Sequence, residues 1–356
     1  MKVCIIGDGL VSLTLASVLI KKNLNVDIFT TKKRNLYDQS RTLGISRSNI
    51  DYFNNEIVDI KKILWEIKNI KIYTEKNSKK ELLKFNNENK QIFSIIRNYQ
   101  LQKLLLRKLR NSKFIKFKNN FDINKNKYKL IINSDPTHPY MKKFFSNKIE
   151  KNYNSYAYTT TITHPKIKNN TAFQIFTENG PLAFLPISNS ETSIVYSLRS
   201  LEKKNFSEVN NLVKKYNPIY SIKKINTWSN FRLISSSLRN YYNGNILAFG
   251  DLLHKIHPLA GQGFNMSLRD IKLLSDLIDE KINLGLDLDY SLFQEFQKKS
   301  QDKNFIFLSG IDWVYELFNL ESKTNSNLLN KLINFIGNKK GVNTFLKKFA
   351  DSGIQY

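Results

Sequence analysis

The chain has 356 residues, 41% of them hydrophobic, and a formal net charge of +26. That length allows about two domains with a sizeable core, and the hydrophobic fraction is typical of a folded protein. The charge could indicate a partner rich in phosphate, but lysine is scattered among many Asn, Ile, Phe and Tyr residues. Compositional drift therefore explains more of it, and without a recognisable nucleic-acid-binding motif we expect no nucleic-acid partner.

Two further features of the sequence bear on where the chain works. The single cysteine, Cys4, lies in an apolar run and is interpreted as a buried thiol in a reducing compartment. No secretory signal opens the chain, and no run of about 18 apolar residues occurs. We therefore expect a cytoplasmic protein without a membrane span, with a weak attraction of its basic surface to the inner face of the membrane.

The first 30 residues predict a βαβ unit. The run KVCII (2–6) is a buried strand, a glycine turn follows, and LVSLTLASVLIKK (10–22) is a helix before the strand NVDIFT (25–30). A glycine turn between a strand and a helix N-terminus is an anion site, because free N–H groups and the helix dipole favour negative charge. The expected dinucleotide contacts are Gly7, Gly9, Leu10, Val11 and Ser12.

This turn departs from the usual dinucleotide fingerprint at two positions. Ser12 stands where a third glycine normally serves close packing between helix and strand. Thr30 ends the second strand, where Asp or Glu normally binds the ribose hydroxyls, and it can offer only one hydroxyl. Both residues are nevertheless assigned to the cofactor site.

The remaining elements predict a discontinuous nucleotide-binding domain with a β-rich insertion. A helix over 99–109 and a buried strand over 128–133 precede a run of period-two patterns that begins near 153 and turns at 179–181. A parallel-type strand returns over 245–250, and helices follow it to the end of the chain. The expected segments are 1–150 and 241–290 for the nucleotide-binding domain, 151–240 for the β-rich domain and 291–356 for a C-terminal helical region.

A second glycine loop, GDLLHKIHPLAGQGFNMSLRD (250–270), follows the returning strand. Asp251 is placed to accept hydrogen bonds from a polyol, and the glycines direct another helix N-terminus at the same site. A flavin fits both features, because its ribityl chain carries hydroxyls and its reduced ring carries negative charge.

This loop resembles the second FAD motif of the ubiquinone-biosynthesis hydroxylases, a branch of the para-hydroxybenzoate-hydroxylase-like flavin monooxygenases. The matching residues are Gly250, Asp251, His254, Pro258, Gly261, Gln262, Gly263, Asn265 and Asp270. Three other stretches are similar to the family: 39–53 with Arg41 at the flavin-facing position, 172–187, and the helices from 289 on. The resemblance implies an α/β fold: a discontinuous Rossmann-like FAD-binding domain with a parallel sheet, an inserted antiparallel substrate domain, and C-terminal helices.

The glycine loops and the resemblance together define a candidate site. The expected cofactor contacts are Gly7, Gly9, Leu10, Val11, Ser12, Thr30, Arg41, Asp135, Gly250, Asp251, Gly261, Gln262, Gly263, Phe264 and Asn265. The expected flavin-ring and substrate side comprises Arg41, His257, Pro258, Leu259 and Gly261. No residue is assigned as a catalytic acid or base. No metal is expected, because His254 and His257 lack further ligands at a suitable spacing.

The resemblance also implies an activity. NAD(P)H or another donor would reduce FAD, O2 would add to give a C4a-hydroperoxyflavin, and the ring of a polyprenylated ubiquinone precursor would be hydroxylated. The implied partners are a polyprenylated phenol or quinone precursor, the membrane surface and ubiquinone-pathway proteins. One family motif departs from the pattern: Asp135 is kept, but Pro136 replaces the glycine after it.

Two alternatives to this activity stay open. The departures at Ser12, Thr30 and Pro136 would suit a non-catalytic paralogue that binds prenyl-quinone intermediates or scaffolds a biosynthetic complex. A prenyl-lipid reductase of the same fold is the other alternative.

Two groups of apolar residues also have two interpretations each. The aromatic residues Phe173, Phe176, Phe184 and Tyr196 are interpreted as core, although one face of a sheet against a flavin must line the substrate pocket. The segment 325–356 is interpreted as a packed helix pair, with a membrane-surface element as the alternative.

Overall fold

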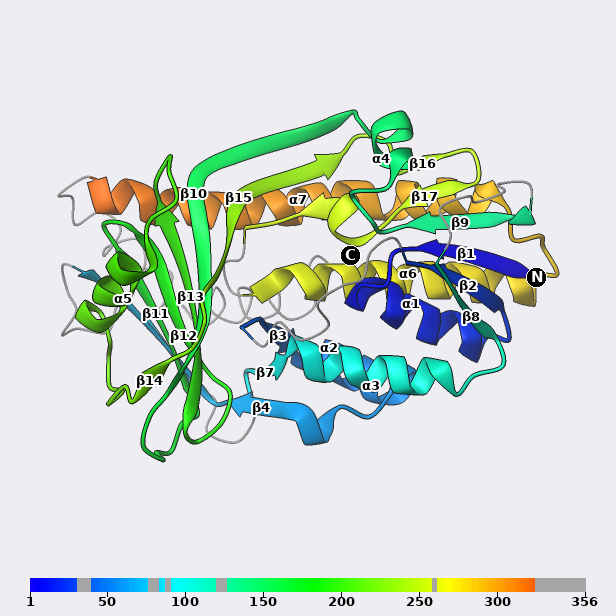
Figure 1. Cartoon of the computed structure of the whole chain (residues 1–356). Helices are drawn as coiled ribbons and strands as arrows, with labels where there is room; N and C mark the ends of the chain where they lie inside the picture. Colours follow the sequence, from blue (N-terminus) through cyan, green and yellow to red (C-terminus); the bar gives the residue numbers. More distant parts are fainter. Residues whose placement is uncertain (31–39, 76–82, 87–90, 120–126, 258–260, 324–356) are drawn as a thin grey trace.

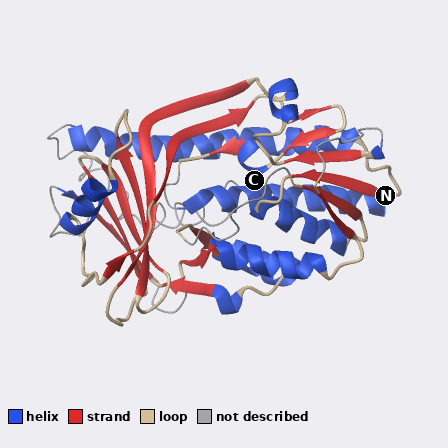
Figure 2. Cartoon of the chain, viewed as in Figure 1, coloured by secondary structure: helices blue, strands red, loops and turns tan. Residues whose placement is uncertain are grey.

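The computed structural model describes residues 1–30, 40–75, 83–86, 91–119, 127–257 and 261–323. These residues form two main sheets with helices around them (Figures 1 and 2). The first sheet has the strand order β16-β17-β9-β1-β2-β8 and is parallel except for β16. Its strands are β1 (Lys2–Ile6), β2 (Asn25–Phe29), β8 (Ile115–Lys118), β9 (Leu130–Asn133), β16 (Tyr242–Asn243) and β17 (Ile246–Ala248).

The central strands of this parallel sheet are almost entirely buried, as expected for strands with helices packed on them. Helix α1 (Leu10–Lys21) packs against α3 (Asn98–Arg110) and α6 (Gln262–Asn283). The long helix α7 (Tyr290–Lys323) packs along α6 and reaches the second sheet (Figure 1). Strand β17 pairs with β9, so residues more than 100 positions apart complete one sheet.

The second sheet has the path β18-β15-β10-β13-β12-β11-β5-β6, with β14 paired to β10, and most of its neighbouring strands are antiparallel. Its strands are β5 (Asn69–Thr74), β6 (Leu83–Asn86), β10 (Lys148–Thr163), β11 (Thr171–Thr177), β12 (Gly180–Pro186), β13 (Glu191–Arg199), β14 (Lys224–Ile225), β15 (Ser229–Leu238) and β18 (His254–Lys255). Strands β10 and β15 bend away from this sheet and run toward β16 and β17 (Figure 1).

One face of the second sheet carries a separate hydrophobic core. Phe173, Phe184 and Tyr196 lie there and pack with residues of α5 (Phe206–Lys215), which covers the outer side (Figure 1). The interpretation of these three aromatic rings as core is therefore confirmed. Phe176 is three residues from Phe173 on β11, so its side chain points to the opposite face, where it is also buried.

A small third sheet and several short helices connect the two main sheets. The sheet has the order β3-β7-β4, and its strand β3 contacts α6. Its members and the short helices are β3 (Thr42–Ser46), β4 (Leu64–Ile67), β7 (Phe93–Arg97), α2 (Arg47–Tyr52) and α4 (Pro139–Phe144), with a π-helical turn over Phe53–Ile57 and 3-10 turns over Lys61–Ile63 and Gly250–Leu252.

The expected α/β architecture is confirmed: a discontinuous parallel sheet, a largely antiparallel second sheet, and helices at the C-terminal side. Because β5 pairs with β11, the second sheet also uses residues from the segment before 150. None of the helices in the described ranges combines the length and the apolar character needed to cross a bilayer.

Candidate functional site

Three loops meet at the carboxyl ends of β1, β9 and β17. Gly7, with φ of +101°, approaches the β9 loop so closely that an added Cβ would lie 2.8 Å from the Ser134 Oγ. Gly250, with φ of +63°, approaches the first turn of α1, where a Cβ would lie 3.1 Å from Val11 Cγ1. Strands β9 and β1 are neighbours whose connections leave in opposite directions, and ligands of open parallel sheets bind at such a point.

Ser12, at the third position of the glycine fingerprint, forms a side-chain hydrogen bond where a glycine would have no side chain. The buried Ser12 hydroxyl is hydrogen-bonded to the Ser134 hydroxyl, which also donates to the Ile6 carbonyl at 3.1 Å. This bond joins α1 to the loop after β9. The unusual serine at 12 is therefore matched by a serine in the equally unusual loop at 134–136.

The N-termini of α1 and α6 both lack a side-chain cap. Gly9 and Gly261 occupy the two cap positions, and neither helix has an acidic residue in its first turn. Gly261 has φ of +64°, and an added Cβ would lie 3.1 Å from the Gly44 nitrogen of β3. The backbone N–H groups at both helix N-termini are therefore able to donate hydrogen bonds to a negatively charged ligand.

Two buried side-chain atoms beside these loops lack hydrogen-bond partners within the described ranges. They are the Asn133 Nδ2 at the end of β9 and the Gln262 Oε1 at the start of α6. The other amide atom of Asn133, Oδ1, accepts from the Asp135 backbone N–H at 3.0 Å. Buried amides are nearly always paired, so one unpaired donor and one unpaired acceptor indicate a missing polar ligand. These atoms and the glycine cradle fit FAD, which has both donors and acceptors along its length.

Two other residues of the second glycine loop hold α6 against its neighbours. The Asn265 amide is used by β3 and α2: its Nδ2 donates to the Gly44 carbonyl at 2.9 Å, and its Oδ1 accepts from the Ser46 N–H at 3.0 Å and the Asn49 Nδ2 at 2.9 Å. Phe264 is buried against Phe53. Both residues fix α6 against its neighbours, and the cofactor contacts expected of them stay a prediction.

The pair of His254 and Asp270 also has a structural role. The two side chains form a buried hydrogen bond between β18 and α6, and Asn304 of α7 donates to the other oxygen of Asp270 at 3.1 Å. Three elements are thereby tied together behind the glycine loop. This bond gives His254 a structural role, and the flavin-proximal role also weighed for it stays untested.

His257, one of the expected ring-side residues, is buried between two tyrosines. Its ring centre is 4.8 Å from that of Tyr153 on β10 and 4.5 Å from that of Tyr315 on α7. Burial, with a smaller contribution from the cation of Lys151, lowers the pKa of His257 to about 3. The imidazole is therefore neutral at physiological pH and acts here as an aromatic ring.

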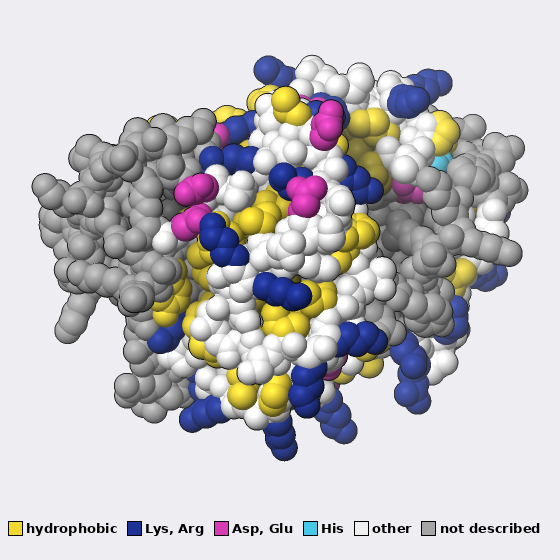
Figure 3. All heavy atoms as spheres, turned by 60° about the vertical axis from the view of Figure 1, so that its left-hand side comes forward, with side chains coloured by type: hydrophobic (Ala, Val, Ile, Leu, Met, Phe, Trp, Pro, Cys, Tyr) yellow, Lys and Arg dark blue, Asp and Glu magenta, His cyan; other side chains and the backbone are white. Residues whose placement is uncertain are grey.

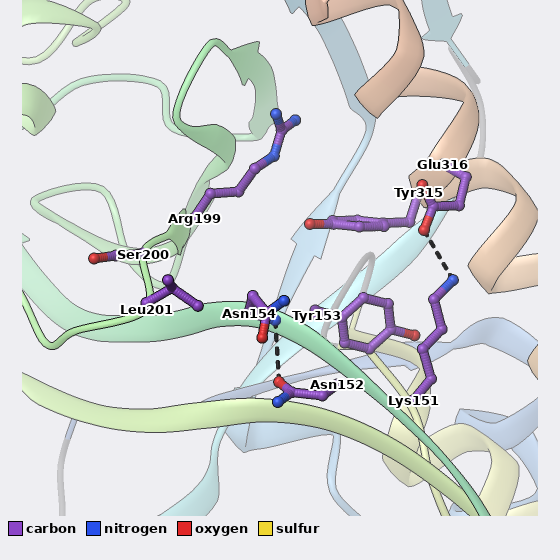
Figure 4. A pocket seen from close by; sticks show the side chains of 9 residues that line it. All are labelled: Lys151, Asn152, Tyr153, Asn154, Arg199, Ser200, Leu201, Tyr315 and Glu316. Atoms are coloured by element: carbon purple, nitrogen blue, oxygen red, sulfur yellow. Dashed lines mark hydrogen bonds and ion pairs between the residues drawn. The ribbon is translucent and has the colours of Figure 1, made fainter.

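A cavity of about 430 Å³ lies beside Tyr153 and Tyr315 (Figure 4). Its lining includes Tyr153, Tyr315, Arg199 and the ion pair between Lys151 and Glu316, whose atoms are 2.9 Å apart.

Four other expected site residues occupy distinct positions. Asp251 is exposed after β17, and Thr30 is half-buried after β2. Asp135 is buried, and its Oδ1 accepts from the N–H and the hydroxyl of Thr137 at 2.8 and 2.7 Å. Arg41 is exposed just before β3, with its guanidinium 5.3 Å from the ring centre of Phe231 on β15.

The structure therefore brings together most of the expected nucleotide-side residues, namely Gly7 to Ser12, Asp135, Gly250 and Asp251. Pro258 and Leu259 lie outside the described residues. Sequence reasoning missed Asn133 and Ser134. The only signal for them was their place directly after the predicted strand at 128–133.

Comparison with known proteins supports the resemblance seen in the motifs. No protein-family model matches the chain. The chain is 30% identical to the 3-demethoxyubiquinol 3-hydroxylase of Escherichia coli, over 41% of this chain and 39% of that protein. It is 26% identical to the ubiquinone hydroxylase UbiL of Rhodospirillum rubrum, over 47% of this chain and 41% of that protein. Each match spans about two fifths of the relative, and the resemblance to ubiquinone-biosynthesis hydroxylases is confirmed.

Solved structures show the same fold over nearly the whole chain. The p-nitrophenol 4-monooxygenase PnpA of Pseudomonas putida superposes with a TM-score of 0.81 at 12% identity, covering 99% of this chain and 98% of that one. A single-residue variant of Klebsiella pneumoniae HpxO, complexed with FAD, superposes with a TM-score of 0.78 at 11% identity, covering 99% of both chains. At such identities the likeness concerns the fold alone, and it confirms the fold of a flavin monooxygenase.

Proposed function

We propose that this chain is an FAD-dependent monooxygenase that hydroxylates the aromatic ring of a polyprenylated ubiquinone precursor. The activities of the relatives and the flavin-monooxygenase fold support this proposal. The observation that carries it is the meeting of the Gly7 and Gly250 loops at the point between β1 and β9. The two helices that follow these loops have uncapped N-termini, and Asn133 and Gln262 each have an unpaired side-chain atom in the described residues.

Each part of the site would hold a different part of FAD. The N-terminus of α1 would bind the pyrophosphate, and the exposed Asp251 carboxylate would accept hydrogen bonds from the ribityl hydroxyls. The N-terminus of α6 would stabilise negative charge on the ring. When bound, FAD would supply the redox chemistry that activates O2, with NAD(P)H as the proposed electron donor.

The chain's own contribution would be placement and exclusion of water. His257 is neutral and enclosed by Tyr153 and Tyr315, so it is not a candidate for a charged acid or base at physiological pH. Burial also raises the pKa of the Tyr153 phenol, which bonds to Asp312. His257, Tyr153 and Tyr315 would exclude water from the flavin-ring side of the site. The oxygen-transfer route that the family resemblance implies stays a prediction.

We also propose peripheral contact with a membrane, where a polyprenylated substrate would reside. The solvent-facing side of α7 changes along its length from Lys298 and Lys299 to the exposed apolar residues Phe305, Ile306 and Trp313. Figure 3 shows Lys and Arg side chains spread among apolar patches on the side that carries the antiparallel sheet. Such a surface would attract anionic lipid weakly, by about 1 kcal/mol for each well-placed lysine.

One observation favours a non-catalytic paralogue as the second candidate. One oxygen of the Asp135 carboxylate is already occupied by Thr137, in the motif that departs from the family pattern. A protein with that function could bind a prenyl quinone without retaining a flavin.

Titration of the purified protein with FAD separates the two candidates. The proposal expects saturable binding with a changed flavin absorbance spectrum, and thermal stabilisation that rises with FAD concentration. Absence of both at saturating FAD would favour the paralogue, and prenyl-quinone binding in that state would support it. Gly7→Val is the matched control, because its side chain would occupy the space against Ser134 and should abolish FAD binding.

A further inference from the structure

The second sheet presents a row of small or polar side chains to the rest of the molecule. The strand register places five residues side by side across β15, β10, β13, β12 and β11: Ser229, Thr159, Val195, Ala183 and Gln174. All except Thr159 are partly exposed. We call these five residues the central row.

Hydrogen bonds show which way the central row faces. The Ser40 hydroxyl donates to the Ser229 hydroxyl at 3.0 Å, and the Thr42 and Ser193 hydroxyls are 2.8 Å apart. Ser193 is two residues from Val195 on β13, so it points to the same face. The central row therefore faces β3 and the glycine loops, opposite the aromatic core under α5.

Thr159 differs from the other threonines of its strand. Its side chain is 6% exposed, and its Oγ1 is fully buried without a hydrogen-bond partner in the described ranges. Thr160 donates to the Asn226 carbonyl at 2.9 Å, and Thr161 accepts from the Asn226 Nδ2 at 2.7 Å. A buried hydroxyl without a partner is costly, so its presence on the face toward the glycine loops points to a polar ligand.

We propose that the Thr159 hydroxyl is a specificity-determining contact for the ring oxygen of an aromatic substrate. The inference rests on the proposed function and adds to it the residue that recognises a phenol. Val195 and Ala183 form a low, apolar floor on which a flat ring can lie, and Thr159 stands at the edge of that floor. The hydroxyl can donate to a phenolate oxygen or accept from a phenol O–H, so it would select an oxygenated ring over a bare one.

The test compares Thr159→Val with Thr161→Val, which lies on the same strand and face. For each variant we would measure the melting temperature without ligand. On FAD-loaded protein we would then measure binding of ortho-prenylphenol and of prenylbenzene through the change in flavin absorbance. Thr159→Val removes an unpaired hydroxyl, so it should melt at the wild-type temperature or above it. Thr161→Val loses the bond to Asn226 and should melt lower.

Ligand selectivity completes the test. Wild type and Thr161→Val should prefer ortho-prenylphenol over prenylbenzene, and Thr159→Val should lose about three- to tenfold of that preference. Unchanged preference in Thr159→Val would overturn the inference, as would a melting temperature lowered as far as in Thr161→Val. Failure of the wild-type protein to bind FAD would instead contradict the proposed function, and the melting temperatures would still report on Thr159.

Discussion

Replacing Ser12 by glycine restores the third fingerprint glycine and, on this structure, should weaken the fold. Ser12→Gly removes the buried hydrogen bond to the Ser134 hydroxyl, worth about 1 kcal/mol. Glycine in the first turns of α1 costs roughly 0.5 kcal/mol more than serine. The sum is a loss of about 1.5 kcal/mol, or a melting temperature lower by about 2 °C for a chain of this size.

Differential scanning calorimetry of the wild type, Ser12→Gly and Ser12→Ala checks this prediction. Ser12→Ala loses the same bond but gains helix propensity, so it should melt between the other two. FAD affinity should not improve in Ser12→Gly, because the close approach at this site is already made by Gly7 and Gly250. A melting temperature of Ser12→Gly equal to or above that of the wild type would refute the compensating role of Ser134.

Three further predictions concern the same site. Asp251→Ala should weaken FAD binding by roughly tenfold to a hundredfold in equilibrium titration, and Thr30→Ala by no more than about fivefold, because only the carboxylate makes charge-assisted bonds. Asn265→Ala should lower the free energy of unfolding in urea by about 3 kcal/mol or more, because it leaves β3 with unpaired buried groups. His257 takes up a proton on unfolding between pH 6.5 and about 3, so stability should fall as pH falls through that window, by up to about 1.4 kcal/mol per pH unit. His257→Phe should keep the ring contacts and flatten that slope, and an unchanged slope would count against a neutral buried imidazole.

Local patterns predicted the elements that position the site. Strand β1, helix α1 and strand β2 follow the predicted βαβ unit within a residue or so at each end, because the apolar run and glycine turn are contiguous in the chain. The second glycine loop could also be predicted from its sequence. Gly261 adopts a positive φ directly before α6, a conformation that favours glycine.

The partners of single polar residues could not be predicted in this way. Asn265 was expected to contact the cofactor, and only the tertiary structure shows that its amide also bonds to β3. Period-two patterning predicted the strands that carry Phe173 and Tyr196, but it cannot say which face of their sheet meets the other domain. Thr159 could not be predicted as a candidate contact either. No sequence pattern shows that its buried hydroxyl lacks a hydrogen-bond partner among the described residues.

The most direct test of the proposed activity is oxygen incorporation from labelled O2. FAD-loaded protein, reduced and then exposed to ¹⁸O2 with ortho-prenylphenol, should yield a hydroxylated product that carries one labelled oxygen atom, detected by mass spectrometry. Flavin reoxidation that releases only labelled hydrogen peroxide, across a panel of prenyl phenols, would contradict the assignment of this chain as a monooxygenase.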